Sequence, residues 1–239
     1  MTNGVFITGT DTGVGKTRVA AALAHLLYLR GVSLRPRKPV ESGCSEGPEG
    51  LIPQDATTLR EAAGCTEALD DICRYRLRAP LSPERAAARE GMSLDLARLH
   101  AACLHKTGSD DFLLVEGAGG FCSPIARGGL NADLAAGLGL PVLLVAADRL
   151  GTLNHTLLTV EAVRMRGLRL VGVILNQPTP QMDPTMDNAE DLEHWLQLPV
   201  LRLSYASDSG PSAWRREAES LSPLADVLLS STNAKDIGR

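Results

Sequence analysis

The sequence is poor in aromatic residues, which make up 3% of its 239 residues, and it holds no long uninterrupted hydrophobic run. The core must therefore be built from Leu, Val, Ala and Ile. The longest apolar run, residues 138–147, contains a glycine and a proline and is about half as long as a bilayer-spanning helix. We therefore expect no membrane partner.

An excess of basic residues is also missing. The chain has 24 Lys and Arg against 28 Asp and Glu, a net charge of −4 at pH 7, so a nucleic-acid partner is not expected. None of the five cysteines stands in a C-x-x-C pair, which argues against a zinc or redox site. The odd cysteine number, and the lack of a charged and then apolar segment in residues 1–10, favour a cytoplasmic protein with reduced thiols.

Short apolar runs alternate with longer amphipathic stretches along the chain. Near-continuous Val, Leu and Ile in the short runs is typical of a parallel sheet covered by helices on both faces. We therefore predict one α/β domain over residues 1–239 with a doubly wound, mostly parallel sheet, and ligands at the carboxyl ends of its strands. Extended runs are predicted at residues 5–8, 32–40, 112–115, 141–146, 170–175 and 200–203, helices at 16–30, 94–105, 152–166 and 189–196, loops at 41–53 and 177–188, and a flexible tail at 230–239.

The strongest functional signal is the segment GTDTGVGKT at residues 9–17, which follows a predicted strand and opens a predicted helix. Backbone N–H groups of such a loop and the positive end of the helix dipole favour phosphate oxygens. Lys16 would place a positive charge on the β- and γ-phosphates, and the Thr17 hydroxyl is placed to bind Mg²⁺. These features predict a P-loop NTPase. Five residues separate Gly9 from Gly15 where the general motif has four, so a plain glycine-rich turn is the alternative interpretation.

Three further clusters accompany this loop. Lys38 and Ser42, in the segment RKPVESG, would bring a second cation and a hydroxyl to a transferred phosphoryl group if the first two strands are adjacent. A solvated lysine at a strand end is the alternative. Glu116 ends the apolar run of FLLVEGAGG, where a carboxylate typically faces Mg²⁺, and a turn cap is the alternative. For Asp55, the sequence favours an N-cap or first-turn position in a helix over metal binding.

Four segments together resemble the dethiobiotin synthetase family of the biotin pathway. They are GTDTGVGKT at residues 9–17, KPVESG at 38–43, VEGAGG at 115–120 and LGTLNH at 150–155. The five-residue spacing of the first segment is the form that this family uses. The resemblance implies a homodimeric ATP-dependent ligase that closes the ureido ring of dethiobiotin from 7,8-diaminononanoate and CO₂. In the implied reaction a carbamate attacks the γ-phosphate, ADP leaves, and ring closure expels phosphate from a carbamic–phosphoric anhydride.

The resemblance also implies roles for single residues. Its nucleotide-binding set is Gly13, Val14, Gly15, Lys16, Thr17, Glu116 and Asn176, the last of which recognises the base. Its Mg²⁺ ligands are Thr17, Asp55 and Glu116, and its catalytic residues are Thr12, Lys16 and Lys38. The substrate, whose carboxylate tail is met by the partner subunit in this family, is held by Thr12, Lys38, Ser42, Gly119, Gly151 and Asn154.

The chain departs from the family pattern at three places. Ser82-Pro83-Glu84 stands where Ser-Pro-His is frequent, residues 202–205 replace a Gly-x-x-Pro-like segment that should border the base, and residues 177–188 have no counterpart that aligns. Two other functions stay open. A nucleotide-switched, partner-binding ATPase of the partition or septum-positioning type would usually carry an extra lysine near Thr10 and Asp11. An amide-forming ligase of cobalamin synthesis would usually carry a glutamine-hydrolysing domain.

Overall fold

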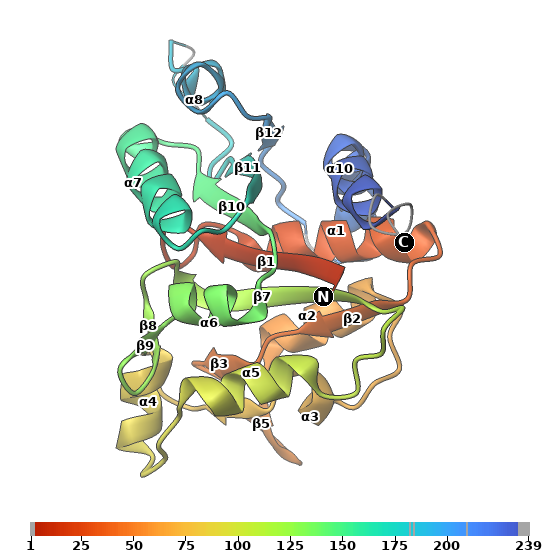
Figure 1. Ribbon diagram of the computed structural model, residues 1–239, viewed down its shortest axis with the longest axis vertical. Helices are drawn as coiled ribbons and strands as arrows, with labels where there is room; N and C mark the ends of the chain where they lie inside the picture. Colours follow the sequence, from red (N-terminus) through yellow and green to blue (C-terminus); the bar gives the residue numbers. More distant parts are fainter. Residues whose placement is uncertain (1–2, 182, 184, 209, 234–239) are drawn as a thin grey trace.

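A sheet of parallel strands forms the centre of the molecule in a computed structural model that describes residues 3–181, 183, 185–208 and 210–233. In this part of the chain the sheet has six strands in the order β12-β11-β10-β1-β7-β2 (Figure 1). The predicted parallel α/β fold is therefore confirmed. The strands are β1 (Asn3–Gly9), β2 (Leu34–Arg37), β7 (Phe112–Gly120), β10 (Val142–Ala147), β11 (Leu170–Asn176) and β12 (Val200–Leu203).

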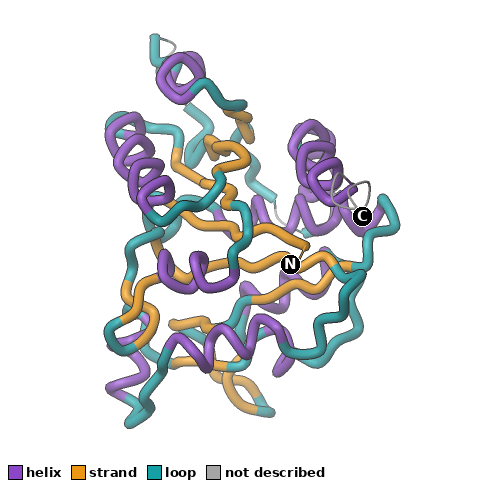
Figure 2. The backbone as a smooth tube through the Cα atoms, viewed as in Figure 1, coloured by secondary structure: helices purple, strands orange, loops and turns teal. Residues whose placement is uncertain are grey.

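Helices cover both faces of this sheet, as the tube drawing shows (Figure 2). Alternate side chains of a strand point to opposite faces, so Phe6 joins one apolar cluster while Val5 and Ile7 join the other. The first cluster includes residues of α4 (Pro83–Arg89), α5 (Leu96–Leu104), α6 (Asn131–Leu138), α7 (Thr152–Met165) and α8 (Asn188–Leu196). The second includes residues of α1 (Lys16–Leu29), α2 (Gln54–Ala62), α9 (Pro211–Ser220) and α10 (Ser222–Asn233), and the short α3 (Leu69–Ile72) packs beside α2.

The helix α1 carries the phosphate-loop motif into the core. Val19, Leu23 and Leu27 recur at a spacing of four residues and are fully buried, which places one face of the helix on the sheet. Gly15 precedes the helix at φ 98°, and Gly31 follows its last turn at φ 75°. Both conformations strongly favour glycine, so the sequence marks the start and the end of this helix.

The predicted extended run at residues 32–40 is interrupted in the structure. Strand β2 ends at Arg37, and β3 (Val40–Ser42) pairs instead with β6 (Tyr75–Leu77) in a small parallel sheet. Pro39 cannot donate a backbone hydrogen bond, and the amide of Lys38 bonds to the carbonyl of Ile72 outside the main sheet. The break turns the chain away from the sheet at the point where Lys38 enters the cavity described below.

Two predicted irregular segments are partly regular. The predicted loop at residues 41–53 contains the end of β3 and an antiparallel hairpin of β4 (Ser45–Gly47) and β5 (Gly50–Ile52), because its glycines and proline form a tight turn. A second hairpin joins β8 (Pro124–Ala126) and β9 (Gly129–Leu130). Helix α10 continues to Asn233 and therefore includes the first residues of the predicted tail, and Leu224, Ala225 and Leu228 bury its preceding turns.

The predicted loop at residues 177–188 and the rest of the predicted tail are described only in part. In the predicted loop at 177–188 the described residues are irregular as far as Asp187, and α8 begins at Asn188; residues 182 and 184 lie outside the described part. Residues 234–239 of the predicted tail also lie outside it. Among the described helices, none has the length and apolar content to cross a membrane.

At the amino ends of β2 and β7, Asp111 ties two loops together. Its carboxylate accepts hydrogen bonds from the Ser33 hydroxyl at 2.6 Å, the Arg35 Nε at 2.8 Å and the Gly108 amide at 2.7 Å. Burial opposes ionisation, but these hydrogen bonds, led by that of Ser33, lower the pKa of Asp111 to about 2. This network holds the sheet edge opposite the candidate site.

Candidate active site

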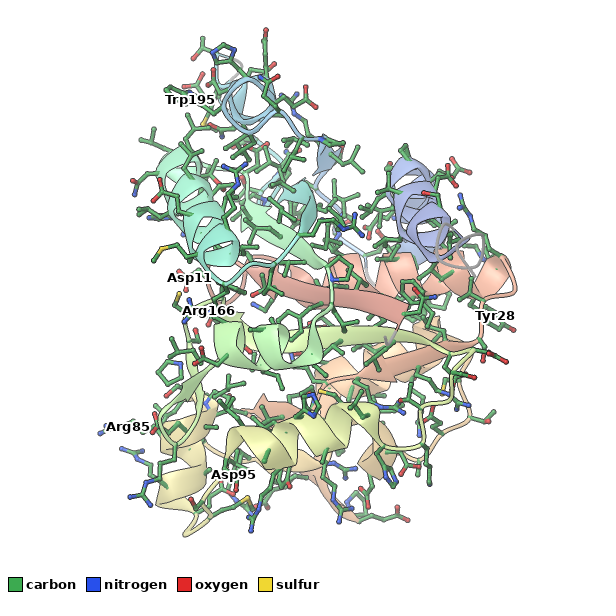
Figure 3. All side chains as sticks on the ribbon, viewed as in Figure 1. Asp11, Tyr28, Arg85, Asp95, Arg166 and Trp195 are labelled. Carbon is green, nitrogen blue, oxygen red and sulfur yellow. The ribbon has the colours of Figure 1, made fainter. Side chains whose placement is uncertain are left out.

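A cavity of about 300 Å³ lies where the phosphate loop meets the carboxyl ends of β7 and β2. Figure 3 labels Asp11 in the loop after β1 and Tyr28 near the other end of α1, on the opposite side of the molecule. The cavity is lined by ten residues predicted from the sequence and by two that were not, Glu41 and Ala118. The ten are Thr12, Gly13, Gly15, Lys16, Thr17, Lys38, Ser42, Asp55, Glu116 and Gly119.

The phosphate loop is shaped by its glycines. Gly13 at φ 74° and Gly15 at φ 98° adopt the left-handed conformation. A Cβ at Gly15 would lie 2.2 Å from the Asn176 Nδ2, so this position also needs a glycine for space. The Val14 side chain is 3% exposed and packs in the core, which leaves only its backbone to the loop.

Lys16 lies at the start of α1 and is 6% exposed. Its Nζ donates to the carbonyl of Asp11 at 2.9 Å, across the mouth of the loop. Burial, and then the neighbouring charge of Lys38, lower the pKa of Lys16 to about 8. Two lysines that repel each other in a buried cavity favour an anion between them.

Glu116 of β7 is fully buried at the centre of the site. Its Oε1 accepts hydrogen bonds from the Thr17 hydroxyl at 2.9 Å and from the Lys38 Nζ at 2.6 Å. Its Oε2 has no hydrogen-bond partner among the described residues. Burial raises the pKa of Glu116, while Lys38 opposes this shift. A buried carboxylate oxygen without a donor is costly, which suggests a ligand at this atom.

Lys38 also reaches Asp55, the acidic residue in the first turn of α2. The Lys38 Nζ lies 2.8 Å from the Asp55 Oδ2, so one ammonium joins two carboxylates. Although burial opposes charge on both groups, the Glu116 and Asp55 carboxylates raise the pKa of Lys38, and Lys38 lowers that of Asp55. The solvated-lysine interpretation is wrong, since Lys38 is 3% exposed.

The first two strands are not adjacent, although this was the condition on which Lys38 was expected to reach the phosphate loop. Strand β7 lies between β1 and β2 in the sheet. Lys38 still reaches the site because Arg37 of β2 is in register with Val115 of β7. The residues that follow these two, Lys38 and Glu116, therefore lie side by side. The intervening strand thus brings the carboxylate to the lysine.

Glu41 is the one ionisable residue of this cavity lining that was not predicted from the sequence. Its two carboxylate oxygens accept from the backbone amides of Asp55 at 3.0 Å and Ala56 at 3.1 Å, so Glu41 caps the amino end of α2 from another segment. The capping role considered for Asp55 therefore belongs to Glu41. Burial and the nearby Asp55 raise the pKa of Glu41 to about 7. The only feature of the sequence that could have indicated Glu41 is its place in the segment KPVES, three residues after Lys38.

Comparisons with known proteins bear on the family of this chain. The sequence model of the AAA domain family matches residues 3–209. An ATP-dependent dethiobiotin synthetase of Anaeromyxobacter dehalogenans is 48% identical over 77% of this chain and 80% of its own length. The same enzyme of Xanthomonas oryzae pv. oryzae is 38% identical over 94% of this chain and 96% of its own.

The chain belongs to the ATP-dependent dethiobiotin synthetase family. The resemblance of the four segments is thereby confirmed. Solved structures show the same fold at low identity. The septum site-determining protein MinD of Pyrococcus horikoshii gives a TM-score of 0.51 and 17% identity, over 95% of this chain and 99% of that chain. The MinC:MinD complex of Aquifex aeolicus gives a TM-score of 0.53 and 15% identity, over 97% of this chain and 96% of that chain. Such identities establish the P-loop fold and do not favour a partner-binding ATPase.

Besides Val14, three residues that the dethiobiotin synthetase resemblance implied lie outside the cavity of the single chain. Gly151 precedes α7 at φ 90°, with open space where a Cβ would lie, and Asn154 is exposed on the first turn of that helix. Asn176, at the end of β11, donates from its Nδ2 to the carbonyl of Val14 at 3.0 Å. It therefore contacts the phosphate loop from the side away from Glu116.

Proposed function

We propose that this chain is an ATP- and Mg²⁺-dependent ligase that forms dethiobiotin from 7,8-diaminononanoate and CO₂. The observation that carries the proposal is the convergence of Lys16, Thr17, Lys38, Asp55 and Glu116 on one cavity beside a phosphate loop. Two cations and two carboxylates at the end of a nucleotide-binding helix suit transfer of a phosphoryl group. Family membership supplies the identity of the acceptor.

The phosphate loop and Lys16 would bind the triphosphate. The Lys16 Nζ is bound to the carbonyl of Asp11, a neutral acceptor that a phosphate oxygen replaces with a stronger charge-assisted bond. The amides at the start of α1 would hold the same phosphates. The γ-phosphate would then lie near Lys38 and Glu116, across the cavity.

Thr17, Asp55 and Glu116 would hold Mg²⁺. They offer only oxygen atoms, the ligands that this ion prefers, and they include the unpartnered buried Oε2 of Glu116. The described residues contain no group of three or more His, Cys, Asp or Glu that would hold a metal alone, so water and phosphate oxygens would complete the set. When bound, the ion neutralises charge on the phosphate oxygens.

The lysines and hydroxyls of the cavity would serve the covalent steps. One amine of the substrate adds to CO₂ and loses a proton, which gives a carbamate. A carbamate oxygen attacks the γ-phosphorus and ADP leaves. The second amine then attacks the carbamate carbon and loses a proton, the C–O bond to phosphate breaks, and phosphate leaves. The ammonium of Lys38 stabilises the charge on the transferred group, and Thr12 and Ser42 donate hydrogen bonds to the carbamate. This chemistry needs positioning and charge, and no protein nucleophile.

The carboxylate tail of the substrate belongs at a subunit interface in this proposal. Gly119 lines the cavity, whereas Gly151 and Asn154 are accessible on the outside of the single chain. A homodimer in which one subunit's Asn154 meets the tail bound to the other fits this arrangement. The homodimer is proposed from the family resemblance of the sequence, and the cytoplasmic location is proposed from its cysteine pattern and the composition of residues 1–10.

A product assay tests the function. The purified chain is incubated with 7,8-diaminononanoate, bicarbonate, Mg²⁺ and ATP, and dethiobiotin is measured by mass spectrometry. We expect product with the wild type and with Lys106→Ala, an exposed lysine paired with Asp71, and none with a folded Lys16→Ala variant. If the chain hydrolyses ATP only with DNA or membranes, and forms no dethiobiotin from the diamine, the proposed ligase function would give way to that of a partner-binding ATPase.

A further inference from the structure

Arg18, the residue after the Lys-Thr pair of the phosphate loop, joins α1 to three other elements. Its Nε and Nη2 lie 2.7 and 2.6 Å from the Oε1 of Glu217 in α9. Its Nη2 also donates to the carbonyl of Ser204, after β12, at 2.7 Å. Its Nη1 donates to the Oδ1 of Asn176, at the end of β11, also at 2.7 Å. The fork of the guanidinium suits such convergent acceptors.

The contact with Asn176 fixes the orientation of that amide. Its Oδ1 faces Arg18, while its Nδ2 donates to the carbonyl of Val14 at 3.0 Å and presses against Gly15. An amide has two acceptor lone pairs and two N–H donors, so one of each remains available for a ligand. A flipped amide would place two donors toward Arg18 and an oxygen toward a carbonyl, and would lose both bonds.

The position of this cluster corresponds to the nucleoside end of a bound triphosphate. The carboxylates and Lys38 lie on the β7 side of β1, whereas Asn176 ends β11 on the other side of β1, beyond β10. If the terminal phosphate points toward Lys38, the nucleoside extends from the phosphate loop in the opposite direction, toward Arg18 and Asn176.

We propose, on the basis of the function proposed above, that Arg18 is a positioning residue for nucleobase selection. By holding the Asn176 carbonyl, it presents one amide donor and one acceptor to the base in a fixed order. It also holds α9 and the Ser204 segment beside the base, where the chain departs from the family pattern. Arg18 touches no reacting atom, so its loss changes nucleotide affinity and selectivity more than phosphoryl transfer.

Calorimetry with two nucleotides tests this role without any ligase reaction. ATP and ITP differ at position 6 of the purine, where an amino donor becomes a carbonyl acceptor. We expect the wild type, with Mg²⁺ and no diamine, to bind ATP more tightly than ITP. Arg18→Gln should weaken ATP binding about tenfold and bring the ratio of the two dissociation constants close to one. In turnover, KM for ATP should rise while kcat changes little.

Two further variants make the test specific. Arg30→Gln removes an arginine at the other end of α1 that bonds Asp226 and Ser222 of α10, and it should leave the ATP-to-ITP ratio unchanged. In an Asn176→Ala background, Arg18→Gln should have little further effect, because Arg18 acts through that amide. If circular dichroism shows that Arg18→Gln is unfolded, Arg18→Lys replaces it, with the same expected loss of selectivity.

Several outcomes would overturn the role of Arg18. These are an unchanged ATP-to-ITP ratio in Arg18→Gln, an equal change in Arg30→Gln, or additive effects of the Arg18 and Asn176 substitutions. A wild type that binds ATP selectively but forms no dethiobiotin would contradict the ligase function and leave the role of Arg18 intact.

Discussion

Replacing Lys38 by methionine removes the ammonium that joins two carboxylates and keeps the aliphatic length of the side chain. The Nζ lies 2.6 Å from Glu116 and 2.8 Å from Asp55. At an effective dielectric constant of ~20, each attraction amounts to about 6 kcal/mol before the cost of desolvation is subtracted. Removing one partner of a buried pair destabilises by about 3–5 kcal/mol. Since the Asp55 side chain is 37% exposed, we expect the lower end of that range.

The assay is thermal unfolding of the full chain without nucleotide, first in chelator and then with added Mg²⁺. A loss of about 3 kcal/mol corresponds to a fall in Tm of roughly 6–12 °C for a protein of this size. Added Mg²⁺ should raise the Tm of Lys38→Met more than that of the wild type, because the ammonium no longer competes for the same carboxylates. Dethiobiotin formation should fall about 10²–10³-fold.

Lys106→Met is the matched control. Its Nζ lies 2.8 Å from Asp71, but the lysine side chain is 60% exposed, so its loss should cost less than about 1 kcal/mol. The reasoning is refuted if Lys38→Met is as stable as this control in chelator, or if Mg²⁺ raises the Tm of Lys38→Met and the wild type equally.

Two further predictions concern the phosphate loop and the far edge of the sheet. Both Gly15→Ala and Gly13→Ala should cost about 1–2 kcal/mol of backbone strain. Gly15→Ala should lower the Tm further and weaken ATP binding, because its Cβ would lie 2.2 Å from the Asn176 Nδ2, whereas a Cβ at Gly13 would meet open space. Equal losses of Tm for the two variants in nucleotide-free protein would contradict this. Hydrogen bonds lower the pKa of Asp111 to about 2, although burial opposes this shift. The ionised Asp111 should therefore stabilise the fold above pH 4, and this contribution should be lost as the pH falls toward 2. Urea unfolding should therefore show Asp111→Asn weaker than wild type by on the order of 1 kcal/mol at pH 6 and nearly equal at pH 2, with the exposed Asp110→Asn neutral throughout; a gap that persists at pH 2 would rule out the ionised carboxylate as its source.

The local features of this protein followed from the sequence alone. The strand and helix around GTDTGVGKT, the two glycines that shape the loop, and the parallel character of the sheet are consequences of residue periodicity and backbone sterics. These act over a few residues and do not depend on distant partners. Most residues that line the cavity were also predicted from the sequence, but several of them, among them Asp55 and Gly119, were predicted only through the family resemblance.

Only the tertiary structure decided how distant segments meet. The placement of β7 between β1 and β2 set Glu116 beside Lys38, and no local pattern encodes that strand order. Glu41 caps a helix from another segment, and Arg18 engages Asn176 and Glu217 across more than 150 residues of chain. Such contacts arise from the way crossovers stack elements on the sheet. The sequence thus determines which chemical groups are present, while the fold determines which of them form ion pairs, hydrogen bonds or a common ligand site.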